Sequence, residues 1–218
     1  MGNWALVILA SFVLGSIPTA LWCGRALRGI DLREHGSGNL GATNVYRVLG
    51  RGWGITVLLL DAAKGSVAVA LARHLAGETS GGAWLPIAAL FASVAGHMFT
   101  PFARWRGGKG VATTAGGWLA LAPQVLAIVL GFWILVFACT RIVSIASILA
   151  GLALPIVLAW KSDAPISDPM VWAGAAVGLL ILIRHRANIQ RLRRGEESRL
   201  VLRGAGTART GSRPAGSR

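Results

Sequence analysis

Long apolar stretches alternate with short polar ones along most of the chain. Most of these stretches approach or reach the roughly 20 residues that a helix needs to cross the hydrocarbon core of a bilayer. Several begin at a tryptophan, a residue that is common at the membrane–water interface. The pattern predicts an all-α integral membrane protein with membrane segments over Trp4–Cys23, Trp53–Ala72, Trp84–Phe102, Trp118–Cys139, Ile142–Trp160 and Met170–Ile183.

Basic residues in the connections indicate how these segments are oriented. Five lie between Arg25 and Arg51, three lie between Arg104 and Lys109, and many more follow from Arg184 onward. Because Lys and Arg accumulate on the cytoplasmic side, these three regions should face the cytoplasm. Three crossings between Lys109 and Arg184 would put those two regions on opposite sides of the membrane, so a fourth crossing is required.

Pro123 provides the place for the additional crossing, because a proline tends to end or kink the helix before it. We therefore expect a short helix over residues 111–122 and a second over 124–139, which returns Arg141 to the cytoplasmic side. The prediction is about seven transmembrane helices, some short or broken, with the N-terminus outside and the C-terminus in the cytoplasm. A single kinked helix, with a weak charge signal at Lys161, is the alternative.

The composition agrees with a membrane protein. The 218 residues are 54% hydrophobic and 14% charged, which is more apolar surface than one small soluble core can bury. The net charge is +14, and ten arginines follow Ile183, a clustering that favours the anionic cytoplasmic leaflet. Nucleic acid is not an expected partner, because the rest of the chain is expected to lie in lipid. We expect a membrane domain over residues 1–197 and a basic, disordered cytoplasmic tail over 198–218.

The sequence carries no motif for a metal or a disulfide framework. Cys23 and Cys139 lie inside apolar runs and lack the CxxC or Cys/His spacing of a zinc site. The sequence also contains no carboxylate cluster suited to a metal ion. We therefore predict neither a metal nor a cofactor.

Candidate chemistry begins in the polar connection after the first apolar stretch, which we interpret as a loop. Its twelve residues Gly36–Arg47 hold three glycines, four small polar side chains and one arginine. Glycine lets backbone N–H groups turn toward an anion, Ser, Thr and Asn add donors, and arginine adds a permanent planar charge suited to phosphate. An ordinary polar loop is the alternative, but it needs no such density of donors. The connection therefore predicts an anion site.

A glycine nest that contains a lysine follows the third apolar stretch. Gly107, Gly108 and Gly110 surround Lys109 and lead into the helix expected from residue 111. A helix N-terminus preceded by a glycine-rich turn is suited to phosphate binding. The GxxxxGK[ST] spacing of a nucleotide-hydrolysing P-loop is missing. Together with the first loop on the same face, the nest predicts two phosphate subsites.

Polar residues also appear where the last membrane segment emerges. If the chain stays helical after Arg184, His185 and Asn188 lie three residues apart on one face and can reach one site. A histidine at a membrane edge is often only an interfacial residue, and basic residues after a last helix are often topological anchors.

Two further polar groups lie within the apolar stretches. Arg141, Ser144 and Ser147 form a polar stripe that enters the membrane, although serines in such helices are often packing groups. Asp61 and Lys64 lie three apart, a spacing that suits a neutralised pair in the bundle interior. That pair can be structural or functional, because ionisable groups at membrane depth are candidates for both.

The three polar regions resemble the sequence motifs of the bacterial acyl-phosphate:glycerol-3-phosphate acyltransferases, the PlsY family. The motifs correspond to Gly36–Arg47, Gly96–Thr113 and Arg184–Glu197, and the similarity extends from about Gly15 to Glu197. The resemblance implies a seven-helix, multi-pass enzyme of the bacterial cytoplasmic (inner) membrane, with its active site facing the cytoplasm.

The resemblance also implies a reaction. A long-chain acyl phosphate would donate its acyl group to the 1-hydroxyl of sn-glycerol 3-phosphate, giving 1-acyl-sn-glycerol 3-phosphate (lysophosphatidic acid) and phosphate. This is the first acylation step of phospholipid biosynthesis. The implied partners are the two substrates and membrane lipids, with no cofactor, metal, acyl-CoA or acyl-carrier protein.

Roles for individual residues follow from the same resemblance. The catalytic residues would be Ser37, Arg47, Lys109, His185 and Asn188, and Glu197 would be structural. Thr100-Pro101 and Arg106 depart from the family's usual second motif but keep a turn and a charge. The substrate-binding residues would be Gly38, Asn39, Thr43, Asn44, His97, Gly107, Gly108, Gly110, Thr113, Arg141 and Ser147.

The expected mechanism is mainly one of gathering two anions, because an acyl phosphate already carries a good leaving group. We expect the phosphate of glycerol 3-phosphate to take the hydroxyl proton, since no acidic partner for His185 is evident in the sequence. His185 as the base is the alternative.

Sequence features argue against three other protein classes. The HxxxxD acyltransferases are excluded, because the fifth positions after the four histidines are Leu40, Thr79, Phe102 and Gln190. An organic-phosphate transporter should show repeats and a path to the outer face. A CDP-alcohol phosphotransferase needs metal-binding aspartates that this sequence lacks.

Overall fold

The computed structural model describes residues 4–76 and 84–200. Within these ranges the chain forms ten α-helices and one 3-10 helix, without a β-strand. Their order is α1 Trp4–Ser16, α2 Thr19–Arg28, α3 Ala42–Leu49, α4 Arg51–Ala76, α5 Trp84–Met98, η1 Pro101–Ala103, α6 Val111–Leu121, α7 Pro123–Thr140, α8 Val143–Lys161, α9 Pro169–Arg184 and α10 Arg186–Arg193.

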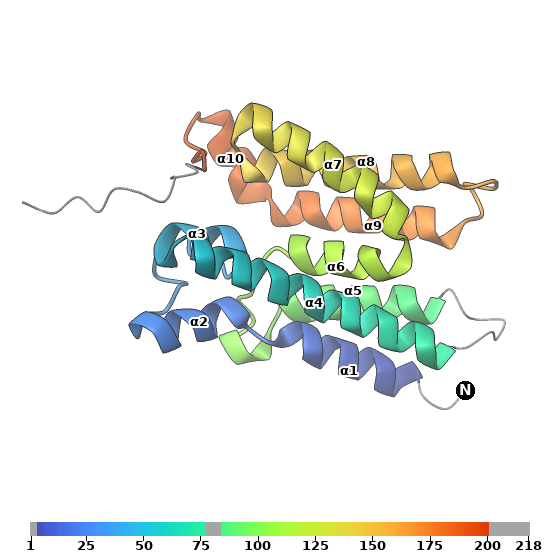
Figure 1. The fold of residues 1–218 in the computed structure, drawn as a ribbon, viewed down its shortest axis with the longest axis horizontal. Coiled ribbons are helices and arrows are strands. Elements are labelled where there is room, and N and C mark those ends of the chain that lie inside the picture. The colour runs from blue at the N-terminus through green and yellow to red at the C-terminus, as the bar shows by residue number, and fades with distance from the viewer. Residues whose placement is uncertain (1–3, 77–83, 201–218) are drawn as a thin grey trace, which may run out of the picture.

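The long helices run roughly parallel to one axis and form two groups (Figure 1). One group contains α1, α4, α5 and α6, and the other contains α7, α8 and α9. The short polar helices α2, α3 and α10 gather at one end of the molecule, whereas α1 begins at the other end (Figure 1). The three regions that the sequence marks as basic therefore lie at a common end.

Among the described residues, five helical segments are long and apolar enough to cross a membrane, and α9 with α10 makes a sixth if that bent pair is one span. The apolar helix α6 is shorter, with 11 residues. The protein is thus an all-helical integral membrane protein, as the hydrophobic pattern predicts.

The break at Pro123 is confirmed. Ala122 has an extended, non-helical backbone with φ −148°, and Pro123 occupies the first turn of α7, where its missing N–H is not needed. α6 runs away from the polar end and α7 returns toward it (Figure 1). The alternative of one kinked helix is therefore wrong.

The first apolar stretch differs from the single helix expected over Trp4–Cys23. It divides into α1 and α2 around Ile17 and Pro18, since proline lacks an N–H and its ring clashes with the preceding helical turn. The carbonyl oxygen of Ile17, released from helical pairing, accepts a hydrogen bond of 3.1 Å from the Lys64 ammonium. The break thus serves a buried polar contact.

The first motif was expected to be a loop, but part of it is helical. From Ala42 to Leu49 it forms α3, which places Arg47 in a helix beside the cavity described below. The third stretch is shorter than expected as well, because α5 ends at Met98 and not at Phe102. Local apolar character continues beyond Met98, but the chain turns there through η1.

Glycines allow the closest contacts between helices. A Cβ atom on Gly116 of α6 would overlap the Ala62 carbonyl of α4, and one on Gly65 of α4 would overlap the Thr113 carbonyl. α1 and α5 approach in the same way, because a Cβ on Gly15 would overlap the Ser93 carbonyl. Such small residues permit close backbone packing where lipid offers no hydrophobic driving force between helices.

Candidate active site

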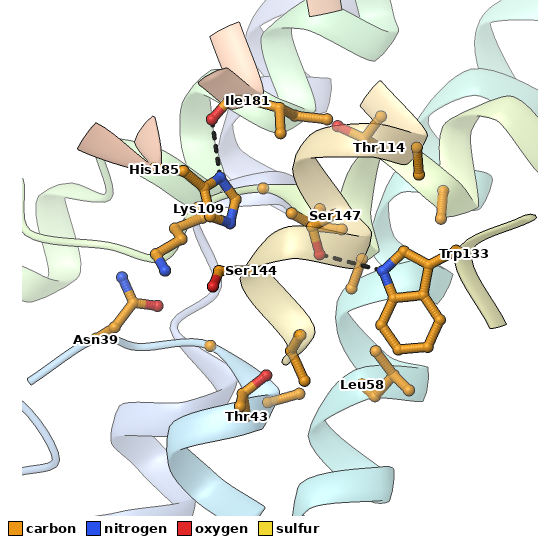
Figure 2. Close-up of a pocket in the computed structure, with 18 of the residues that line it drawn as sticks. Asn39, Thr43, Leu58, Lys109, Thr114, Trp133, Ser144, Ser147, Ile181 and His185 are labelled. Carbon is orange, nitrogen blue, oxygen red and sulfur yellow. Dashed lines mark hydrogen bonds between the residues drawn. The ribbon is translucent and has the colours of Figure 1, made fainter. Parts of the chain in front are cut away.

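One cavity of about 690 Å³ is lined by residues from both helix groups. Its wall changes from polar to apolar along its length: side chains such as Asn39, Lys109 and His185 lie at one end, and Leu58 and Trp133 lie toward the other (Figure 2). A cavity of this kind can hold an amphiphile whose head is anionic and whose tail is hydrocarbon.

The first motif folds around the side chain of Asn44, which is buried. The Asn44 carbonyl oxygen accepts a hydrogen bond of 2.8 Å from the Ser37 N–H, and its amide group donates to the carbonyls of Leu32 and His35. Gly36 and Gly38 have φ values of 62° and 68°, which glycine adopts without strain. Asn44 therefore holds the loop in shape and leaves Ser37 at its exposed surface.

The glycine nest lies directly on the end of α5. Gly107 N–H donates to the Met98 carbonyl and Gly108 N–H donates to the His97 carbonyl, both at 3.1 Å. Neither glycine can carry a side chain, because a Cβ would overlap the His97 carbonyl in one case and the His97 ring in the other. These contacts set the start of α6 and the position of Lys109.

Lys109 projects into the polar end of the cavity (Figure 2). Its ammonium donates a 2.5 Å hydrogen bond to the side-chain oxygen of Asn188, and no carboxylate in residues 4–76 and 84–200 makes a salt bridge with it. Burial lowers the pKa of Lys109 to about 8; the cations of Arg191, Arg47 and Arg184 also lower it, while Glu197 opposes the change. This arrangement favours an added anion.

The junction between α9 and α10 brings the third motif to the same place. The chain is helical again from Arg186, but α9 and α10 meet at His185 with a bend of 57°. His185 and Asn188 both line the cavity. His185 is buried, and its Nδ1 lies 2.8 Å from the Ile181 carbonyl. A carbonyl can only accept, so Nδ1 carries the hydrogen and Nε2 is the acceptor of the neutral ring.

Arg184 connects this junction to the glycine nest. Its guanidinium donates a 2.8 Å hydrogen bond to the Gly108 carbonyl and lies over the ring of Phe99, 5.2 Å from the centroid. The nest is therefore held from α5 on one side and from α9 on the other.

Glu197 fastens the chain after α10 to the cavity wall. Its carboxylate accepts hydrogen bonds from Ser144 at 2.8 Å, Asn188 at 2.6 Å and Arg191 at 2.7 Å. Burial raises the pKa of this carboxyl, but the three hydrogen bonds outweigh it and lower the pKa overall. Glu197 therefore stays ionised and orients the Asn188 amide that contacts Lys109.

Residues 198–200, which begin the predicted tail, also contact the cavity end. The Ser198 carbonyl accepts from the Arg47 guanidinium at 3.3 Å, and Leu200 N–H donates to the Arg141 carbonyl at 2.8 Å. The rest of the predicted tail lies outside the described residues.

A buried ionic cluster lies behind the nest. Asp61 and Lys64 of α4 form a salt bridge of 2.8 Å, and Asp61 also accepts a 2.7 Å hydrogen bond from the Thr19 hydroxyl. His97 Nδ1 lies 3.6 Å from the same carboxylate. The cluster connects α2, α4 and α5, and it places the His97 ring against Gly108.

The apolar part of the cavity is lined mainly by α4, α6, α7, α8 and α9. Trp133 and Phe137 of α7 stack with a centroid distance of 5.2 Å, and the Trp133 N–H donates to the Ser147 hydroxyl at 3.2 Å. Figure 2 shows the Trp133–Ser147 hydrogen bond, with Leu58 near the Trp133 ring in this view. The Ser147 hydroxyl is thus used as the acceptor for Trp133.

Most of the predicted site residues come together around this one cavity. The residues in its wall are Ser37, Asn39, Thr43, Asn44, Arg47, His97, Lys109, Gly110, Ser147, His185, Asn188 and Glu197. Gly38, Gly107, Gly108, Thr113 and Arg141 are not in its wall. The two nest glycines instead shape the turn beneath Lys109, and Thr113 packs its backbone against Gly65 of α4.

Several wall residues were not predicted as site residues. Ser144 belongs to the predicted polar stripe but was not assigned to the site, and Arg184 and Arg191 could have been found from the basic run of the third motif. Thr114 and Trp118 carry no comparable signal, because a threonine and a tryptophan in an apolar helix are ordinary.

The arrangement is suited to binding an anionic molecule that carries a hydrocarbon chain. Lys109, Arg47, Arg184 and Arg191 concentrate positive charge at the polar end, while the apolar wall can receive a hydrocarbon chain. Positioned cations of this kind stabilise negative charge as a phosphate leaves.

Comparison with known proteins identifies the family. The family model described as "Glycerol-3-phosphate acyltransferase" matches residues 5–195. A glycerol-3-phosphate acyltransferase of Synechococcus sp. (strain JA-2-3B'a(2-13)) is 45% identical over 195 residues, covering 89% of this chain and 94% of the relative. One of Gloeobacter violaceus is 44% identical over 202 residues, covering 91% and 97%.

A solved structure is similar in fold as well. The crystal structure of PlsY (YgiH), an integral membrane glycerol 3-phosphate acyltransferase, in its glycerol 3-phosphate form, has a TM-score of 0.82 and 36% identity. The match covers 92% of this chain and 96% of that chain. The lysophosphatidic acid form of the same enzyme matches with a TM-score of 0.79. The chain therefore belongs to the glycerol-3-phosphate acyltransferase family.

Proposed function

We propose that the protein transfers a fatty acyl group from a long-chain acyl phosphate to the 1-hydroxyl of sn-glycerol 3-phosphate. The products are lysophosphatidic acid and phosphate. Membership in the family and the two ligand-bound forms of the related PlsY enzyme support the acceptor and the product. The proposal depends mainly on the position of Lys109. This cation is partly buried and lies where the cavity wall changes from polar to apolar. No carboxylate of the described chain forms a salt bridge with it.

An acyl phosphate donor fits the charge of the cavity. Both substrates are then phosphate anions, and the cations Arg47, Lys109, Arg184 and Arg191 can be shared between them. Holding the two molecules together makes the attack effectively unimolecular, which contributes up to about 7–11 kcal/mol in favourable cases.

The reaction proceeds by direct transfer. The 1-hydroxyl oxygen forms a bond to the acyl carbon, the bond from that carbon to the bridging phosphate oxygen breaks, and phosphate leaves with the bonding electrons. The hydroxyl proton passes to the phosphate of glycerol 3-phosphate. Lys109 and the neighbouring arginines neutralise the charge of the departing phosphate.

Substrate assistance is preferred because the described chain gives His185 no carboxylate partner that would orient it as a base. His185→Ala should keep measurable activity with a near-normal pH profile. Complete loss that imidazole restores would instead make His185 the base.

The polar end of the cavity should face the cytoplasm of a bacterial inner membrane, with seven crossings and the N-terminus outside. The basic residues around α2, α3, the nest and α10 support this orientation under the positive-inside rule. A cysteine introduced at Ser198 in a background without Cys23 and Cys139 should react with an impermeant thiol reagent only after cells are opened. One introduced at Asp163, in the connection at the other end, should react in intact spheroplasts.

The donor is tested with the purified protein in detergent or lipid. Glycerol 3-phosphate is supplied with palmitoyl phosphate, with palmitoyl-CoA or without a donor, and both lysophosphatidic acid and phosphate are measured. Product from palmitoyl phosphate alone is the expected result. Binding of glycerol 3-phosphate without product from either donor would favour an organic-phosphate transporter.

A further inference from the structure

Three buried polar atoms of cavity-wall residues have no hydrogen-bond partner in the described part of the chain. One is Nε of Arg184, a side chain whose terminal nitrogen already donates to the Gly108 carbonyl. The other two are the hydroxyl oxygen of Thr114 and the indole nitrogen of Trp118, both on α6. The two residues are 5% and 1% exposed, and both line the cavity. Trp133 and Ser147, which also line the cavity, are hydrogen-bonded to one another. Buried polar groups nearly always have a hydrogen-bond partner. Two neighbouring groups without one in a cavity wall therefore indicate a ligand atom that binds there.

The two side chains share one face of α6. Residues four apart lie one turn from each other, and helical side chains lean toward the N-terminus, so the Trp118 indole extends toward Thr114. Figure 2 shows Thr114 at the cavity beside Ile181, on the side opposite Leu58. Because α6 begins at Val111, just after Lys109, Thr114 lies about one helical turn deeper than the phosphate-binding end.

The chemistry of the pair selects an acceptor. An indole N–H can only donate, and a threonine hydroxyl can donate as well. The surrounding wall is apolar, with Ile181, Leu126 and Leu154 among its side chains. The ligand atom is therefore an oxygen carried by a mainly hydrocarbon molecule.

We infer that Thr114 and Trp118 form a donor subsite for the carbonyl oxygen of the acyl group that is transferred. In an acyl phosphate this carbonyl is the one polar group between the phosphate and the chain. A phosphate at Lys109 and a tail in the apolar part of the cavity place the carbonyl just inside the membrane from the nest. This inference rests on the proposed function, because it takes an acyl phosphate as the donor.

The subsite assigns Thr114 a catalytic role. When the 1-hydroxyl adds to the acyl carbon, the carbonyl oxygen takes the electron pair of the C=O bond and becomes an oxyanion. That pair re-forms the C=O bond as phosphate leaves. A hydroxyl already directed at this oxygen stabilises the developing charge without reorganising.

Thr113 shows why the position on the helix matters. It is also buried without a partner for its hydroxyl, but it is not in the cavity wall and its carbonyl lies against Gly65 of α4. Adjacent threonines on one helix therefore face different surroundings, and only Thr114 can meet the acyl carbonyl.

The kinetic test compares Thr114→Val, which removes the hydroxyl at nearly constant volume, with Thr114→Ser, which restores it. Steady-state rates are measured with palmitoyl phosphate and glycerol 3-phosphate. Thr114→Val should lower kcat on the order of 100-fold, as loss of one oxyanion donor does, with little change in KM for glycerol 3-phosphate. Thr114→Ser should recover to within a few-fold of the parent. Thr56→Val on the exposed face of α4 is the matched control and should keep the parental rate.

A binding test separates the carbonyl subsite from a general effect on packing. Calorimetry compares a long-chain acyl phosphonate, which keeps the carbonyl, with an alkyl phosphonate of equal chain length, which lacks it. Thr114→Val and Trp118→Phe should each weaken binding of the first ligand by roughly three- to tenfold, the value of one net hydrogen bond, and leave binding of the second within about twofold. Trp172→Phe, on the exposed surface of α9, is the control for the tryptophan change.

Equal weakening of both phosphonates, or an unchanged kcat in Thr114→Val, would overturn the subsite. A parent enzyme that makes no lysophosphatidic acid from palmitoyl phosphate would overturn the proposed function, while the phosphonate comparison would still decide the subsite. If Thr114→Val fails to fold, Trp118→Phe and Thr114→Ser are compared in the binding test. The subsite is supported if Trp118→Phe no longer prefers the acyl phosphonate over the alkyl phosphonate while Thr114→Ser still does. It is overturned if both variants keep that preference.

Discussion

Two lysines with different surroundings, Lys64 behind the glycine nest and Lys109 within it, distinguish the structural part of this protein from its reactive part. Lys64 is 6% exposed and is neutralised on its own helix by Asp61, with the Ile17 carbonyl as a second partner. Lys109 is partly buried and contacts the uncharged amide of Asn188, with Arg47, Arg184 and Arg191 nearby.

The difference shows which buried charge is available to a ligand. A lysine that already has a carboxylate and a carbonyl has little to gain from a phosphate, so the Lys64 cluster supports the helices and the position of His97. A lysine among cations is stabilised when an anion arrives. The same residue type thus serves the fold in one region and the substrate in the other.

The largest expected effect comes from replacing one partner of the Asp61–Lys64 salt bridge. Lys64→Met leaves the Asp61 carboxylate buried without its cation, and removal of one partner from a buried pair costs about 3–5 kcal/mol. Thermal unfolding of the purified protein in detergent should show a large loss of stability. The double variant Asp61→Leu/Lys64→Met should recover most of it, because two apolar side chains can replace a buried pair. Similar melting of Lys64→Met and the parent would mean that the pair is not structural.

Removing the reactive lysine should affect activity and not stability. Lys109→Met takes away a cation that stabilises the departing phosphate, and we expect acyl transfer to fall on the order of 10²–10³-fold. The melting temperature should stay near that of the parent. Lys109 has no salt bridge within the described chain, so its removal leaves no carboxylate there without its cation. Lys161→Met, an exposed lysine at the other end of the molecule, should retain full activity. Parental rates in Lys109→Met would remove the contrast between the two lysines.

The pKa of Lys109, lowered to about 8 chiefly by burial, predicts an alkaline limit. The ammonium is protonated below pH 8 and loses its charge above it, so kcat/KM should fall about tenfold between pH 7 and pH 9. Lys109→Arg should lose this limb whatever its rate, because a guanidinium stays charged. An identical alkaline limb in Lys109→Arg would assign the titration to another group.

The smallest effect concerns the carboxylate that orients Asn188 beside Lys109. Glu197→Gln keeps the size of the side chain but removes the charge that Ser144, Asn188 and Arg191 contact. The Glu197 side chain is 7% exposed, but Gln keeps an acceptor oxygen for these donors, so we expect about 1 kcal/mol in stability and a several-fold lower rate. Glu196→Gln, at the exposed neighbouring position, is the control in the same melting and rate measurements. Equal behaviour of the two variants would mean that Glu197 does not orient Asn188.

Much of the fold followed from local sequence. The membrane segments and the break at Pro123 were predicted, because hydrophobicity and the missing proline N–H act within a few residues. The break at Pro18 and the bend at His185 were not predicted. Both involve partners distant in sequence, since the freed Ile17 carbonyl accepts from Lys64 of α4, and Arg184, beside the bend, donates to the Gly108 carbonyl of the nest.

The candidate site was predictable in its polar residues and not in its apolar ones. The glycine-rich and basic motifs have few structural explanations, so Ser37, Lys109 and Asn188 could be named before their positions were known. Thr114 and Trp118 look like ordinary members of an apolar helix. Their significance comes from the absence of a partner in the described chain, which no sequence pattern records.

By itself the sequence determined that the chain crosses a membrane, where its polar connections lie and which residue types could bind phosphate. These properties depend on hydropathy, charge and backbone freedom over short distances along the chain. The tertiary structure decided which polar residues meet and that one face of α6 presents two donors to the cavity. It also decided that Lys64 has a carboxylate partner, whereas Lys109 has none within the described chain. Those outcomes depend on breaks, bends and glycine contacts that bring together helices far apart in the sequence, and electrostatic and hydrogen-bond energies are set by those distances.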